Sequence, residues 1–119
     1  RLYGVECIPT VTGVQADHRL RLKSGDVESV ARSLAAQLGV KVNSMVTAPA
    51  GIPAGWIEAV VRDLQGHKGA CVVVAGEQQP PVVHALAHAM NAALEAVGKT
   101  VTYTEPVEAS PTDQLQSLR

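Results

Sequence analysis

The sequence predicts an α/β fold with three layers (α/β/α), in which a mainly parallel sheet of about four strands lies between helices. Two observations lead to this prediction. Strand-like and helix-like segments alternate along most of the chain, an order typical of parallel sheets. Apolar residues make up 46% of the 119 residues but aromatics only 3%, so the core must be aliphatic, as in most parallel sheets. We expect one α/β domain over residues 1–104, and a C-terminal extension over 105–119 that leads into a downstream region.

Two short strands are predicted near the N-terminus. Residues 2–6 form the first, and a loop over 9–13 follows, whose Pro, Thr and Gly suit the C-terminal end of a strand. Residues 18–22 alternate polar and apolar side chains, which predicts a second strand with one buried face.

An amphipathic helix is predicted next. Apolar residues recur at helical spacing over 27–38 and form a stripe on one side. Ser24 or Asp26 can cap the free N–H groups at its start, and Gly39 can end it.

The middle of the chain predicts a loop, a helix and a central strand. Residues 42–54 are rich in Pro, Gly, Ala and Thr and are expected to form a connection, with a helix from near Pro53 to Gly66. Residues 70–75 are uninterruptedly apolar, which is typical of a strand covered on both faces. We expect this strand to lie at the centre of the core.

The last predicted elements are a long helix and a strand. Pro80-Pro81 suits a helix start, and the helical pattern continues to about Val97, where Gly98 follows. Residues 100–104 are β-branched and alternating, which predicts the final strand.

Charge and hydropathy restrict the classes of partner. The charged residues are scattered along the chain and their net charge is −1, so a nucleic-acid partner is not expected. No apolar run approaches the roughly 20 residues that span a bilayer, so no direct membrane insertion is expected. The first residues lack the design of a signal peptide, and the chain has the character of an internal fragment of a longer protein. Cys7 and Cys71 are distant in sequence and are predicted to be buried free thiols.

Candidate binding residues lie where predicted strands end. Parallel sheets bind ligands at the carboxyl ends of their strands, where helix N-termini present free N–H groups. The loops at residues 10–13, 25–26, 76–79 and 105–106 would meet there. None has the glycine spacing of a phosphate-binding loop, and ordinary turns would also use these residues.

Three further groups of polar residues are candidates for a site. His84 and His88 are one helical turn apart, but no third metal ligand is indicated, and a polar stripe with Asn91 and Glu95 explains them better. No metal site is therefore predicted.

The other two groups each contain a carboxylate. Asp17, His18 and Ser24 are too close in sequence to act as a hydrolase triad, so no catalytic residue is predicted. Glu6 and Glu105 could form a carboxylate pair at strand ends, or they could each serve a helix N-terminus. The sequence leaves both alternatives open.

The order of short motifs resembles the molybdopterin oxidoreductase superfamily. In the first half, that family shows a strand, a Thr-rich stretch, an Ala-Asp pair, a second strand and a turn entering a helix. This chain matches with Val5-Glu6, Thr10-Val11-Thr12-Gly13, Ala16-Asp17-His18-Arg19-Leu20 and Ser24-Gly25-Asp26. In the second half, GACVVVAG over 69–76, the helix after it and Val97-Gly98-Lys99 are similar to a strand, helix and turn of the family. The resemblance covers nearly the whole chain.

The amino-acid sequence of residues 73–94 and 97–108 is most similar to one branch of this superfamily, the iron–sulfur subunit of alternative complex III and related hydrogenase-like proteins. That resemblance implies a non-catalytic, Rossmann-like structural lobe in a membrane-associated electron-transfer complex that oxidises quinols, on the periplasmic face of the bacterial cytoplasmic membrane. The implied partners are other domains of the same polypeptide and other subunits. Iron–sulfur clusters would lie in the missing remainder, and the fragment itself would bind no cofactor.

The catalytic relatives imply an alternative function. Their equivalent lobe binds the guanosine end of molybdopterin guanine dinucleotide, with an acidic residue in the turn that enters the helix. By resemblance, the cofactor-binding residues would be Thr12, Gly13, Gly25, Asp26, Gly76 and Glu77. The family turn reads Arg-Pro-Gly-Thr-Asp, but here Pro is absent, Asp26 stands in the Thr place and Val27 in the Asp place. Because guanine recognition needs a correctly placed carboxylate, this shift favours the structural role.

Overall fold

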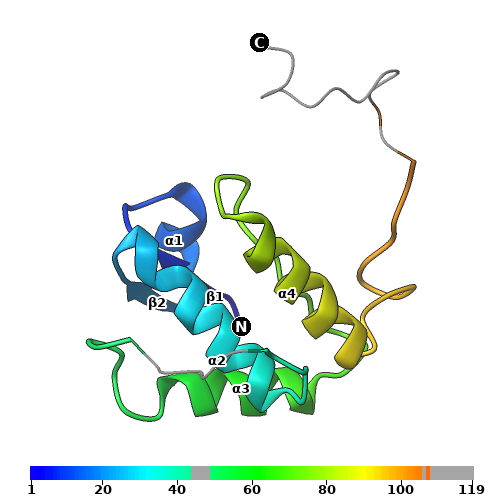
Figure 1. The fold of residues 1–119 in the computed structure, drawn as a ribbon, viewed down its shortest axis with the longest axis horizontal. Coiled ribbons are helices and arrows are strands. Elements are labelled where there is room, and N and C mark those ends of the chain that lie inside the picture. The colour runs from blue at the N-terminus through cyan, green and yellow to red at the C-terminus, as the bar shows by residue number, and fades with distance from the viewer. Residues whose placement is uncertain (44–48, 106, 108–119) are drawn as a thin grey trace.

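A computed structural model describes residues 1–43, 49–105 and 107 (Figure 1). Within them, two strands and five helical segments follow one another along the chain. Their bounds are β1 Tyr3–Glu6, α1 Val11–Gln15, β2 His18–Arg21, the 3-10 helix η1 Ser24–Asp26, α2 Val27–Gln37, α3 Trp56–Gly66 and α4 Pro81–Ala93. The predicted extension over 105–119 lies outside the described residues, apart from Glu105 and Val107. None of the described helices has the length and apolarity needed to cross a membrane.

The two predicted N-terminal strands form, and they pair in parallel. Tyr3 aligns with His18 and Glu6 with Arg21. Leu20 and Leu22 are buried and the residues between and before them are exposed, which confirms the half-buried pattern. The predicted loop over 9–13 is wrong in part, because α1 begins inside it. Parallel strands need a crossover between them, and α1 lies in this one.

Helix α2 is the centre of the packing. Figure 1 shows it lying across the strands, with α3 and α4 beside it. Val30 packs with Leu20 and Leu22 of the strand region, while Ala31 and Ala35 pack with α4. Helix α2 matches its predicted range to within one residue, whereas α3 ends at Gly66 as predicted but begins at Trp56 and not near Pro53. Helix α4 ends at Ala93, before the predicted end near Val97. Gly39 has the left-handed φ of 84° expected where a helix ends.

The predicted three-layer fold with about four strands is wrong. The described residues contain a two-stranded parallel sheet, β1–β2. Residues 70–75 form no ladder, and of the predicted strand at 100–104 only Val101 makes a bridge, to Val97. The described chain is therefore a small compact α/β fold.

Burial explains why the segment 70–75 was mispredicted as a strand covered on both faces. Val73 and Ala75 pack against the core between α2 and α4. Val72 is 49% exposed and Val74 80% exposed, so the other face is open. An uninterrupted apolar run indicates apolar surroundings on both sides, but here only one side is covered by described residues.

Asn91 of α4 takes the place of a neighbouring strand for this segment. Its side-chain amide donates to the carbonyl oxygen of Val73 at 2.8 Å, and its Oδ1 accepts from the Val73 N–H at 2.8 Å. Asn91 is only 4% exposed, so it does not belong to the solvated or partner-facing polar stripe in which it was predicted to lie. Burial is possible because both ends of the amide are hydrogen-bonded.

Replacing Asn91 with Ala is expected to lower the free energy of unfolding by about 1–3 kcal/mol, because it leaves the N–H and carbonyl of Val73 without partners near the core. Urea unfolding of the variant and the parent chain measures this difference. The exposed Asn43 provides the control, since Asn43→Ala removes the same amide from a surface position. Equal stability of the two variants would contradict the role of Asn91.

Candidate functional site

The carboxylate of Glu6 organises the chain where β1 ends. It accepts a hydrogen bond from Thr10 Oγ1 at 2.6 Å, a longer one from the Thr10 N–H at 3.4 Å, and an ion-pair hydrogen bond from Arg19 Nε. Thr10 Oγ1 in turn accepts from the Gly13 N–H at 3.1 Å and so caps α1. We call the set of Glu6, Thr10, Gly13 and Arg19 the Glu6 brace, which joins β1, α1 and β2.

Gly13 makes room for this brace. It is buried within α1, and a Cβ atom added there would overlap the carboxylate of Glu6. Its role is therefore close approach, because only a glycine lets the helix backbone lie against the Glu6 side chain.

The donors around Glu6 also set its ionisation. The hydrogen bond from Thr10 Oγ1 and then that from Arg19 hold the pKa of Glu6 below its ordinary value, against the opposing effect of desolvation. The carboxylate is thus ionised at neutral pH. Its oxygens already accept from donors of this chain, so the Glu6 brace stabilises the strand end.

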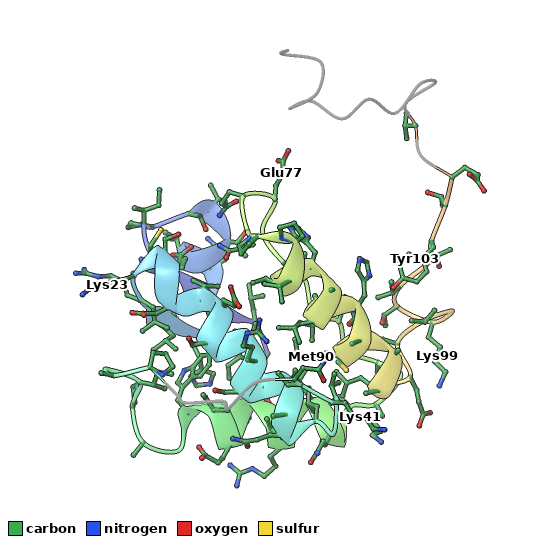
Figure 2. The ribbon with its side chains drawn as sticks, in the orientation of Figure 1. Lys23, Lys41, Glu77, Met90, Lys99 and Tyr103 are labelled. Carbon is green, nitrogen blue, oxygen red and sulfur yellow. The ribbon has the colours of Figure 1, made fainter. Side chains whose placement is uncertain are left out.

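The structure separates the six predicted cofactor-binding residues into three places. Thr12 and Gly13 lie on α1, Gly25 and Asp26 on η1, and Gly76 and Glu77 in the loop before α4. Figure 1 shows α1 and the loop before α4 at the same end of the molecule. The side chain of Glu77, however, points away from the helices in Figure 2.

A large cavity lies between β1 and residues 70–76, and sequence reasoning missed it. It has a volume of about 700 Å³ and is lined by β1, by one side each of α2, α3 and α4, and by the 70–76 segment. Of the six predicted residues, only Gly76 lines it. No sequence signal could have located the cavity, because it exists where the described chain leaves two extended segments apart.

The other predicted groups fall into ordinary roles. Tyr103 and His88 Nδ1 are 2.8 Å apart, and the part of the chain that the structure describes contains no cluster of three metal-ligating side chains. Asp17 accepts from the backbone N–H of Leu2 at 2.7 Å, and this bond lowers its pKa. Figure 1 shows the orange segment near residue 105 leading away from the strands, so the end of β1 and this segment do not meet at one sheet edge.

The cysteines agree only in part with their prediction. Both are free thiols, but Cys7 is exposed, while Cys71 is half-buried and burial raises the pKa of its thiol. Sequence reasoning also missed Asp63, which accepts from Tyr3 Oη at 2.7 Å and pairs with Arg1. These bonds lower the pKa of Asp63 and hold α3 against the start of β1.

Comparison with known proteins gives no relative: no family model matches this chain, and no curated protein matches it either.

Replacing Gly13 with Ala is expected to displace the Glu6 carboxylate from Thr10 and Arg19 and to raise the pKa of Glu6 toward its ordinary value, because the new methyl group occupies the carboxylate position. A carbon-detected NMR titration of the Glu6 side chain measures this. Gly25→Ala is the matched control, since a Cβ atom at Gly25 meets nothing within 4 Å. An unchanged pKa of Glu6 in Gly13→Ala would disprove the close approach.

Replacing Glu6 with Gln is expected to alter how stability depends on pH. Because the pKa of Glu6 is lower in the folded chain, its contribution is present above the ordinary value near 4.3 and is lost as pH falls through the folded-state pKa. The difference in unfolding free energy between the parent and Glu6→Gln should therefore be largest at neutral pH and should shrink by about pH 3. Urea unfolding at both pH values measures it, with the exposed Glu58→Gln as control. A difference that grows on acidification would refute this assignment.

Proposed function

We propose that this chain is a non-catalytic structural lobe of a molybdopterin-oxidoreductase-like iron–sulfur subunit, in a complex that oxidises quinols at the periplasmic face of the bacterial cytoplasmic membrane. The resemblance of the motifs at residues 5–26 and 69–99 supports this family, and the sequence of residues 73–94 supports this branch of it. The iron–sulfur clusters belong to other parts of the same polypeptide. The lobe holds those parts in position.

The observation that carries the structural role is the Glu6 brace. Strand ends are where a ligand of an α/β protein would be recognised, and Glu6 is the acidic residue at the end of β1. Its carboxylate is directed to Thr10 and Arg19 and is only 12% exposed. A carboxylate used in this way supports a role in fastening α1 to the strands.

The apolar surface around the cavity supports the same proposal. Ile8 is 66% exposed and Val74 80% exposed, and both line the cavity. Large apolar side chains gathered at a hollow are typical of surfaces that pack against another protein segment. A structural lobe needs such a surface.

The alternative is a lobe that binds the guanosine end of molybdopterin guanine dinucleotide. The position of α1 and the loop before α4 at one end of the molecule favours it (Figure 1). Asp26 would then recognise guanine, with Gly76 and Glu77 near the nucleotide. The shifted turn at residues 23–27 and the outward direction of Glu77 favour the structural role instead.

Two measurements distinguish these functions. The whole protein that carries this chain is expected to contain iron and no stoichiometric molybdenum, as measured by plasma mass spectrometry of the purified complex. Guanosine monophosphate and adenosine monophosphate are each added to the isolated chain. The amide NMR signals of residues 25–27 and 76–78 should have the same chemical shifts with either nucleotide. Stoichiometric molybdenum, or shifts specific to guanosine in both loops, would replace the structural role with cofactor binding.

A further inference from the structure

Two backbone edges bound the cavity beside β1, the outer edge of β1 and one edge of residues 70–76, and neither is paired with another strand among the described residues. At the two ends of the β1–β2 ladder, the carbonyl of Leu2 accepts from the N–H of His18, and the carbonyl of Glu6 accepts from the N–H of Leu22, just after β2. Backbone groups alternate in direction along a strand, so Tyr3 and Val5 direct theirs to the opposite edge of β1. Both residues line the cavity.

The segment at residues 70–76 presents the second edge. The carbonyl of Cys71 accepts from Thr100 Oγ1 at 2.6 Å, and both backbone groups of Val73 bond to Asn91. The intervening residues Val72 and Val74 therefore direct their backbone groups to the other side. Within the described residues, no hydrogen bond involves those groups, and both residues line the cavity.

We infer that the cavity is a binding slot for one extended aliphatic strand of another polypeptide segment, which pairs with β1 on one side and with residues 70–76 on the other. The inference rests on the structural role proposed above and names its partner. It extends the existing β1–β2 ladder across the slot without a break. Unpaired edges are templates for added strands, a recurrent mode of peptide recognition.

The direction of the bound strand follows from the two edges. β1 leads into α1 and residues 70–76 lead into the loop before α4, and Figure 1 shows α1 and that loop at the same end of the molecule. The two edges therefore run in the same direction. A strand parallel to both can satisfy each with evenly spaced hydrogen bonds.

The chemistry of the bound strand follows from the cavity wall. The wall between the edges is aliphatic and comes from three helices; it includes Val30, Leu34, Val60, Val83 and Met90. The carboxylates that line the cavity already have cations of this chain as partners, Glu6 with Arg19 and Asp63 with Arg1. A charged strand would lose hydration against this aliphatic wall, whereas aliphatic side chains would pack on it.

A fused strand tests this inference in the complete chain. The segment Val-Val-Ile-Val-Val is fused before Arg1 through a linker of about 12 Gly/Ser residues. The linker must run back from the end of the added strand to Arg1, a distance of about 16 Å, and its root-mean-square length of about 19 Å is sufficient. Amide hydrogen exchange is then recorded by NMR. The control fusion carries Pro at the second and fourth strand positions, which removes two N–H donors and keeps the segment apolar.

The expected result is exchange slowed about tenfold or more at Tyr3, Val5, Val72 and Val74 in the valine fusion, and unchanged exchange in the proline control. Amides of α4 report whether each fusion is folded. If a fusion fails to fold, the same strand is added as a lysine-flanked peptide, and amide shifts of the same four residues are recorded.

Three outcomes would overturn the inference. The first is no protection or shift at either edge, and the second is equal protection by the proline control. The third is protection of both edges in the unfused chain at rising protein concentration, with a dimer mass in ultracentrifugation, because the slot would then bind a second copy. Failure here is distinguishable from failure of the proposed function, because the molybdenum and guanosine measurements do not report on the slot.

Discussion

The need of backbone N–H and carbonyl groups for partners shapes this molecule more than any other constraint. The segment after α3 is extended and passes over the aliphatic core, where Val73 cannot leave its polar groups unpaired. Asn91 satisfies both of them from α4. This pairing holds the segment along α4, and the cavity lies between the segment and β1.

The Glu6 brace solves the same problem at the end of β1. Parallel strands require a crossover, and the one between β1 and β2 is short, with a five-residue α1 inside it. So short a helix has little stability of its own. Thr10 caps it, Glu6 holds Thr10, and Arg19 of β2 holds Glu6, so the crossover is fastened to both strands that it connects.

Periodic patterns determined which parts of the fold were predictable. The stripe over 27–38 and the alternation over 18–22 each report on one face, and α2 and β2 form where they indicated. The run at 70–75 reports only that aliphatic side chains occur at every position, and it carries no information on whether a neighbouring strand is present. The Glu6 brace could not be predicted from the sequence either, because the contact between Gly13 and Glu6 depends on how closely α1 lies against β1.

The end of β1 and its outer edge have different partners in this structure. In doubly wound α/β proteins, ligands bind in the crevice at the carboxyl ends of the strands, and in dinucleotide-binding folds an acidic residue there contacts the ligand. Here the acidic residue faces its own chain, while the unpaired backbone groups lie along the side of β1. The strand proposed above would be recognised through those groups, by its direction and its backbone pairing, and its aliphatic side chains would add burial. Binding of that strand would cover Val74, which is 80% exposed beside the core, and would serve the structural role proposed for this chain.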